Sequence, residues 1–162
     1  MIIKDGEMTY ELDLTDWFGH NFPEKEKETI PWFKDQLWDY VKHSHKGMRY
    51  RIMRMSWGVW NGYVYIPSGH PLHGKGFMEE DGEIDKLIVH GGITYNCLSD
   101  ENDQSSDWII GFDTNHMYDH APSDKIRSEE GYNLAVKYYK THAYVIKEAK
   151  NLIKNIRRKY GT

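Results

Sequence analysis

Between residues 48 and 113 the chain alternates short apolar runs with connections that carry little helical pattern. Parallel neighbours in a sheet need a crossover of a dozen or more residues, usually a helix, whereas antiparallel strands can be joined by tight turns. The pattern therefore predicts a mainly antiparallel sheet. Its expected strands are residues 8–14, 48–57, 59–66, 84–90 and 107–113.

Two helices are expected beside this sheet. Thr29 can cap a short N-terminal helix at 30–43. Ser128 can cap a long C-terminal helix at 128–160, which ends before Gly161. The apolar seam of the long helix steps by three and four residues through Ala135, Tyr138, His142, Val145, Ala149, Leu152 and Ile156. The predicted fold class is α+β, with both helices packed on the sheet.

Length and composition bound the remaining possibilities. With 162 residues and no visible linker, the chain is expected to form one domain, 1–162. The net charge of −4 gives no reason to expect binding to long nucleic acids. The single Cys97 excludes an intrachain disulfide and a cysteine zinc cage. No membrane span or signal-peptide profile is visible, which predicts a cytoplasmic location.

The C-terminal segment 128–160 has a charge of its own, with eight Lys and Arg against three Glu. One interpretation is a solvated outer face, with cations suited to a helix C-terminus. The other is an anion-facing helix or the seam of a homo-oligomer.

Five of the nine histidines and eight of the fourteen glycines lie between residues 62 and 122. The first cluster is P-S-G-H-P-L-H-G-K, which contains His70 and Lys75. Gly and Pro at this density force a tight backbone that can point N–H groups at an anion, and Lys75 adds positive charge. The alternative is a structural turn with exposed histidines.

The second cluster, V-H-G-G-I-T-Y, places His90 at the end of an expected strand. Gly91 and Gly92 let backbone or ligand approach closely, and Thr94 and Tyr95 can donate hydrogen bonds to the same pocket. The alternative is a glycine turn with a buried histidine.

The third cluster, G-F-D-T-N-H-M-Y-D-H, spaces Asp113, His116 and Asp119 by three residues. On a helical turn these side chains would share one face. They could hold a divalent metal ion, with a histidine from elsewhere in the chain. They could equally form a base and its orienting carboxylate without metal, or simply cap turns.

Together the three clusters resemble small uncharacterised proteins encoded by bacteriophages and prophages. In that family G-H-P-L-x-G-K, V-H-G-G-[LI]-T-[YF] and W-x-x-G-F-D-x-x-H-x-x-D occur in this order. The resemblance covers residues 62–122 and the helix that follows. It implies a viral origin and a role in the host cytoplasm, such as action against host defence. Its motif positions are His70, Lys75, His90, Thr94, Asp113, His116 and Asp119.

The residues and the resemblance lead to three functional hypotheses. The first is an enzyme that hydrolyses a phosphate ester or phosphodiester in a small nucleotide, a host immune signal for example. Its candidate catalytic residues are His70, His90, Asp113 and His116, with or without one divalent metal ion. The second is a protein that sequesters such a nucleotide without turnover, and the third is an inhibitor that binds a host protein.

Overall fold

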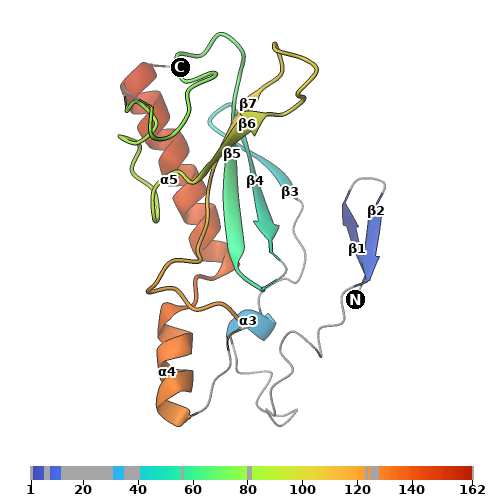
Figure 1. Ribbon diagram of the computed structural model, residues 1–162, viewed down its shortest axis with the longest axis vertical. Helices are drawn as coiled ribbons and strands as arrows, with labels where there is room; N and C mark the ends of the chain where they lie inside the picture. The colour runs from blue at the N-terminus through green and yellow to red at the C-terminus, as the bar shows by residue number, and fades with distance from the viewer. Residues whose placement is uncertain are drawn as a thin grey trace.

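A five-stranded antiparallel sheet with a long C-terminal helix across one face forms the body of the molecule (Figure 1). The structure is a computed structural model, and it describes residues 2–5, 8–11, 31–34, 41–55, 57–79, 82–122, 124 and 128–161. The α+β fold class predicted from the sequence is confirmed.

The strands of this sheet lie in the order β3-β4-β5-β7-β6, and every neighbouring pair is antiparallel. They are β3 (Val41–His45), β4 (Met48–Arg54), β5 (Trp60–Ile66), β6 (Tyr95–Leu98) and β7 (Trp108–Phe112). The strands predicted at 48–57, 59–66 and 107–113 are confirmed as β4, β5 and β7.

Alternation along β4 gives the sheet two different faces. Met48, Tyr50 and Ile52 are buried, whereas Arg49 is exposed and Arg51 is half-buried. Because successive side chains of a strand point to opposite faces, the buried set lies toward the core and the arginines lie on the other face. The core face meets helix α5 (His142–Tyr160), which packs on β5 and β4.

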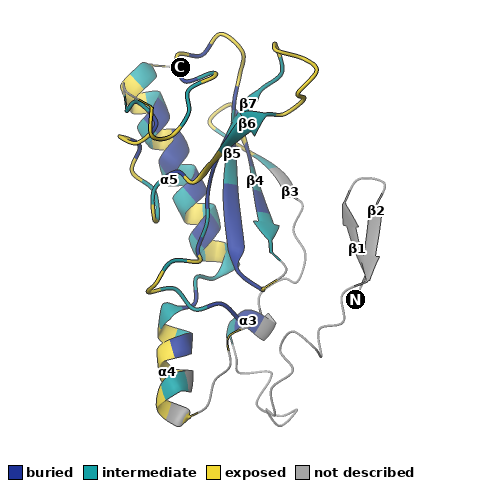
Figure 2. Cartoon of the chain, viewed as in Figure 1, coloured by how far each residue is buried: buried dark blue, intermediate teal, exposed yellow. Residues whose placement is uncertain are grey.

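The apolar seam of α5 fills the core. Its fully buried residues are Val145, Ala149, Leu152, Ile153 and Ile156, on the side that faces β5 in Figure 2. The predicted apolar seam of this helix is therefore used for packing inside the chain. The homo-oligomer predicted through 128–160 stays a prediction. Gly161 closes the helix with a left-handed φ of 74°, as expected for a glycine C-cap.

The single helix predicted at 128–160 is wrong in one respect, because the segment forms two helices. Helix α4 (Glu129–Tyr138) begins after Ser128, whose hydroxyl accepts from the Gly131 N–H. The backbone then becomes extended, and Thr141 caps α5 by accepting from the Tyr144 N–H. A helix-periodic pattern continues through this break, since the periodicity records which residues are buried and not whether the helix is continuous.

The N-terminal predictions hold only in part. Helix α3 spans Pro31–Lys34, residues 35–40 lie outside the described residues, and Val41–His45 is a strand where the predicted helix 30–43 would end. Strand β2 (Met8–Glu11) pairs with β1 (Ile2–Asp5) in a separate two-stranded sheet and not with the main sheet. The rest of the strand predicted at 8–14 lies outside the described residues.

The strand predicted at 84–90 is also wrong. This segment has no strand partner among the described residues and follows α5 through hydrogen bonds to helix side chains. Glu83 accepts from Tyr160 Oη at 2.5 Å, the Ile88 carbonyl accepts from Asn155 Nδ2 at 3.3 Å, and the His90 N–H donates to a helix carboxylate. Hydrogen bonds to α5 therefore take the place of the strand pairing that was predicted for this segment.

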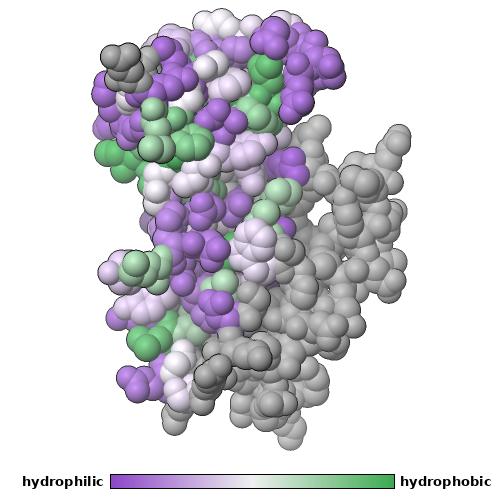
Figure 3. All heavy atoms as spheres, in the orientation of Figure 1, coloured by the Kyte–Doolittle hydropathy of each residue, from purple (hydrophilic) through white to green (hydrophobic). Residues whose placement is uncertain are grey.

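The described surface is mostly hydrophilic on the face shown in Figure 3, where smaller apolar areas interrupt it. Met78, Ile88, Met117 and Tyr118 are the most exposed of the large hydrophobic residues in the described ranges. No helix in those ranges combines the length and apolar content that crossing a membrane requires.

Candidate functional site

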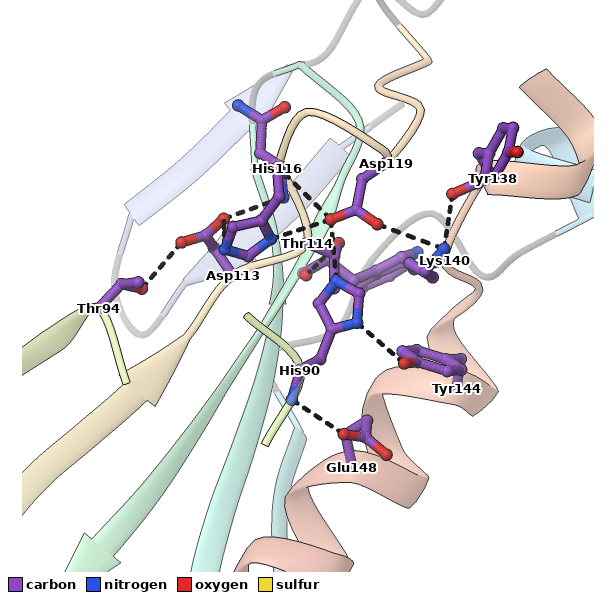
Figure 4. A network of polar contacts seen from close by, with 12 residues as sticks. His90, Thr94, Asp113, Thr114, His116, Asp119, Tyr138, Lys140, Tyr144 and Glu148 are labelled. Carbon is purple, nitrogen blue, oxygen red and sulfur yellow. Dashed lines mark hydrogen bonds and ion pairs between the residues drawn. The ribbon is translucent and has the colours of Figure 1, made fainter. Parts of the chain in front are cut away.

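Three side chains from two of the predicted clusters meet beside the N-terminal half of α5 (Figure 4). His90 Nε2 lies 2.8 Å from Asp119 Oδ2, and His116 Nδ1 lies 3.0 Å from the same oxygen. The two imidazole rings are 5.3 Å apart, centroid to centroid. Two loops that are 26 positions apart in the sequence therefore converge on one carboxylate.

A tight turn after β7 builds one half of this cluster. The Asp119 N–H donates to the His116 carbonyl at 2.9 Å, and the His116 N–H donates to Asp119 Oδ2 at 3.0 Å. The three-residue spacing thus brings these two side chains together as expected, through a turn of non-helical backbone.

Asp119 is the most strongly held group of the cluster. Its side chain is only 3% exposed, and Lys140 Nζ lies 3.3 Å from Oδ1. Burial by itself would raise the pKa of Asp119, but hydrogen bonds from the His90 ring and from the His116 backbone and ring outweigh burial and lower the pKa to about 2. The carboxylate therefore stays ionised at neutral pH.

The ring of His90 is oriented from both sides. Its Nδ1 lies 2.9 Å from Tyr144 Oη, while its backbone N–H donates to Glu148 Oε2 at 3.0 Å. Burial, with the negative charges of Glu148 and Asp119, raises the pKa of the Tyr144 phenol, which therefore keeps its proton. With the outer nitrogen engaged, Nε2 is aimed into the cluster.

Gly91 is required for the close approach of the two loops. Its φ is +65°, and a Cβ at this position would lie 2.0 Å from Cε1 of His116. Gly92 has a φ of +85°, but a Cβ there would meet open space. Of the two predicted glycines, only Gly91 is in contact with the cluster.

Asp113 lies outside the group formed by His90, His116 and Asp119. Its Oδ2 accepts from Thr94 Oγ1 at 2.8 Å, its Oδ1 accepts from the Asn115 N–H at 2.9 Å, and the same Oδ1 is 3.8 Å from His116 Nε2. The sequence grouped Asp113 with His116 and Asp119 as metal ligands. The structure puts His90 in that third position and Asp113 behind His116.

Two imidazoles and one carboxylate are a donor set that catalytic zinc sites use, with a fourth position left for water. The same set binds Fe²⁺ in non-haem oxygenases. One ligand atom each from His90, His116 and Asp119 lie within 4.8 Å of one another. Ligands of a tetrahedral ion are about 3.4 Å apart, so each nitrogen would move outward by a few tenths of an ångström from its present hydrogen bond.

Tyr144 and Asp113 complete this arrangement. If the inner nitrogens of His90 and His116 bind an ion, each outer nitrogen carries a proton. Tyr144 Oη and Asp113 Oδ1 are the acceptors nearest to those protons. Such outer partners fix ring orientation and raise ligand basicity in metal sites.

His70 and Lys75 lie elsewhere. His70 is buried, its Nδ1 accepts from the Leu72 N–H at 3.1 Å, and its ring packs edge-on against Tyr160 at 5.5 Å. Burial lowers the pKa of the His70 imidazole. Tyr160 is about 24 Å along α5 from Tyr144, at 1.5 Å per residue.

The first sequence cluster, which contains His70 and Lys75, therefore forms a loop near the C-terminal end of α5. The Lys75 carbonyl accepts from Trp108 Nε1 at 2.8 Å. Trp108 begins β7, about 17 Å before Asp113 at 3.3 Å per residue. The structure does not bring His70 or Lys75 to the metal-type cluster.

Three contributing residues were missed by sequence reasoning: Lys140, Tyr144 and Glu148. They belong to the segment interpreted as an apolar seam with a solvated face. For Tyr144 and Glu148 the spacing of four residues within α5 was the available signal, because such residues lie on one side of a helix. Lys140 lies in the extended connection between α4 and α5, where helical spacing does not apply. The sequence alone does not show that this polar stripe faces two histidine loops.

A pocket of about 660 Å³ lies on the sheet face opposite α5, and Thr94, Asp113 and Asn115 form part of its wall. Asp113 thus lies between this pocket and His116. Tyr95, predicted to bind ligand, also lines the pocket, while its hydroxyl is 2.9 Å from Cys97 Sγ. The Cys97 contact together with burial raises the pKa of Tyr95 to about 12.

Comparisons of the chain with protein-family models, curated proteins and solved structures found no match.

Proposed function

We propose that the protein hydrolyses a phosphate ester or phosphodiester bond in a small nucleotide, assisted by a divalent metal ion held by His90, His116 and Asp119. The observation that carries this proposal is the convergence of three ligand atoms within 4.8 Å, beside an open pocket whose wall residue Asp113 lies 3.8 Å from His116 Nε2. A metal-type donor set without an adjacent pocket would suit a structural site instead.

The chemistry follows from these positions. An ion held by His90, His116 and Asp119 would lower the pKa of a bound water and so supply a nucleophile at neutral pH. In the hydrolysis, the water oxygen bonds to phosphorus as the bond to the leaving oxygen breaks. The water proton passes to solvent, and a proton from solvent neutralises the leaving oxygen. Asp113 lies on the other side of the His116 ring from the ion position, so it would hold that ring by accepting from Nε2–H. Lys140 offsets negative charge beside Asp119.

A metal-free route uses the same residues. His116 is the more exposed of the two histidines, with 34% of its side chain accessible. It would act as the base toward water, and ionised Asp119 would orient its ring. Removal of metal distinguishes the two routes.

Sequestration without turnover is the second candidate function. The pocket on the open sheet face favours it, since aromatic walls and an arginine bind nucleotides without any chemistry. The resemblance to phage proteins fits either function. In both, the ligand would be a host signal nucleotide in the cytoplasm.

The test begins with chelator-treated protein. Zn²⁺, Mn²⁺, Fe²⁺ and Mg²⁺ are titrated calorimetrically, and linear and cyclic nucleotides are then incubated with the protein and separated by chromatography. We expect one bound ion per chain and a new phosphate-bearing product. His90→Gln should lower turnover at least 1,000-fold.

His73→Gln is the matched control, because His73 Nε2 contacts the Ser106 carbonyl at 2.8 Å and lies outside the cluster. Turnover that survives chelation but is lost in His116→Gln would establish the metal-free route. A nucleotide that binds and returns intact would establish sequestration. Turnover unaffected by both histidine substitutions would refute the proposed site.

A further inference from the structure

The open face of the sheet carries one cross-strand row that is unlike its neighbours. Arg51 pairs with Tyr63, Tyr63 pairs with Gly111, and Gly111 pairs with Tyr95. The row therefore crosses four strands, β4, β5, β7 and β6. All three of its side chains point away from α5, because they alternate with residues of the core face.

Gly111 leaves room for an aromatic ring in the middle of this row. A Cβ at Gly111 would lie 2.7 Å from the ring of Tyr63. Without it, the rings of Tyr63 and Tyr95 meet across the strand at 5.5 Å in an edge-to-face arrangement. The Tyr63 ring thus lies over the backbone of β7 and forms a continuous aromatic wall with Tyr95.

Tyr63 and Tyr95 both line the pocket of about 660 Å³. Its volume suits a drug-sized or nucleotide-sized molecule. Tyr95 and Trp57 line it and remain 44% and 37% exposed. Exposed rings in a pocket wall provide stacking surface for a flat ligand.

A buried polar group on the pocket wall also lacks a partner. Asn61 lines the pocket and is only 9% exposed. Its Nδ2 donates to Tyr63 Oη at 3.3 Å, but its Oδ1 has no hydrogen-bond partner within the described part of the chain. An unsatisfied buried acceptor is costly, and the N–H edge of a bound heterocycle would satisfy it.

The pocket has a polar end that leads to the metal-type cluster. Thr94, Asp113 and Asn115 form that end, and Asp113 Oδ1 is 3.8 Å from His116 Nε2. Arg51 adds positive charge on the same face, with its guanidinium 6.0 Å from the Tyr63 ring centroid. The pocket is therefore aromatic over the sheet and charged where it approaches His116.

We infer that this pocket is a nucleobase subsite, in which the base stacks on the exposed ring of Tyr95, beside Tyr63, and Asn61 reads its N–H edge. The sugar and phosphate then extend past Thr94 and Asp113 toward the cluster. This orientation rests on the proposed function, whereas the base subsite stands on the pocket itself.

The test uses nucleosides, which carry no phosphate, and protein freed of metal by chelation. Adenosine, guanosine, cytidine and uridine are titrated separately, followed by tryptophan fluorescence and by ¹H–¹⁵N NMR shifts. We expect saturable binding of at least one nucleoside, with the largest shifts at Tyr95, Gly111 and Asn61. Tyr95→Ala should weaken this binding about tenfold, the scale of one lost aromatic stack.

Tyr95→Phe is the matched control. It keeps the ring and removes only the hydroxyl contact to Cys97, so its affinity should stay within about twofold of wild type. Because Tyr95 is exposed, neither change should unfold the protein, and circular dichroism checks this. Gly111→Ala would displace the Tyr63 ring, which lies where the new methyl would be, and should also weaken binding.

Two results would overturn the inference: no saturable binding by any nucleoside, or equal affinity in wild type, Tyr95→Ala and Gly111→Ala. Its failure is separable from that of the proposed function. Nucleoside binding without any nucleotide turnover keeps the subsite and rejects hydrolysis. Nucleotide turnover, with nucleosides binding outside this pocket, would support the proposed catalytic site and contradict the base subsite.

Discussion

The two ends of α5 each hold a loop carboxylate whose pKa is lowered to about 2. Near the N-terminal end it is Asp119, and near the C-terminal end it is Glu83. Both are contacted by a lysine, Lys140 for Asp119 and Lys159 for Glu83. Their surroundings differ, since the side chain of Asp119 is 3% exposed and that of Glu83 is 30% exposed.

The partners of the two carboxylates explain the difference in role. Glu83 accepts from Lys159, Tyr160 and Lys86, so it fastens the segment after Gly82 to the helix. Asp119 instead receives two imidazoles. A shifted pKa alone therefore does not identify a functional site; burial and the chemistry of the partners do.

The largest expected contrast is in metal affinity. Asp119→Asn removes the only carboxylate of the ligand set and should weaken binding of Zn²⁺ or Mn²⁺ at least 100-fold, measured by calorimetry. Glu83→Gln should leave affinity unchanged. If both variants bind metal like the wild type, the cluster near the N-terminal end of α5 is not a metal site.

Gly91 and Gly92 provide a second comparison, between contact with the His116 ring and backbone strain alone. In Gly91→Ala the new methyl would collide with the His116 ring, and we expect metal affinity to fall about 100-fold as that ring is displaced. Gly92→Ala has a similar positive φ, with a strain of about 1–2 kcal/mol, but meets open space. It should lose stability without losing affinity by more than about threefold. Equal losses in the two variants would mean that backbone strain, and not contact with His116, is responsible.

The pH dependence of stability should separate the two carboxylates in metal-free protein. Because the folded pKa of Asp119 is depressed to about 2, its contribution is present above the unfolded pKa near 3.8 and is lost as pH falls through 2. The shift corresponds to about 2 kcal/mol. Urea unfolding should show Asp119→Asn destabilised by about that amount at pH 6 and little at pH 2.

Glu83 follows the same sign with a smaller effect. Its contribution is also present above the unfolded pKa near 4.5 and lost toward pH 2. Solvent screens this exposed group, so Glu83→Gln should lower Tm by at most a few degrees at pH 6. A larger loss in Glu83→Gln than in Asp119→Asn would reverse the comparison.

The smallest expected effect concerns the two tyrosines. Tyr144→Phe removes the hydroxyl beside His90 Nδ1 and should weaken metal binding about tenfold, as loss of an outer partner does elsewhere. Tyr160→Phe removes the hydroxyl bound to Glu83 and should leave metal affinity intact. Calorimetry on the two variants decides whether Tyr144 orients the histidine.

Much of the fold could be predicted because local periodicity reports burial. Alternation located β4, β5 and β7, and the three-and-four spacing located the buried side of α5. The residues at 84–90 show the limit of this reasoning. Their apolar content correctly indicated that Ile84 and Leu87 are buried. These two side chains belong to the core, although the segment itself does not form a strand.

The candidate site, like the fold, could be predicted only where neighbouring residues decide the geometry. The spacing of His116 and Asp119 by three residues was sufficient for one tight turn, and the glycines after His90 indicated a close approach. Tyr144 was missed because its role depends on a loop that contacts α5 from 54 positions away in the sequence.

The sequence by itself determined which segments alternate, where the last helix ends, and which short stretches carry imidazoles and carboxylates. These are properties of neighbouring residues, and backbone geometry acts on them locally. Only the tertiary structure decided that His90 joins Asp119, that His70 lies at the other end of α5, and that Tyr63 and Tyr95 line one pocket. Those outcomes depend on which distant segments satisfy one another's hydrogen bonds and packing, and no local period records that choice.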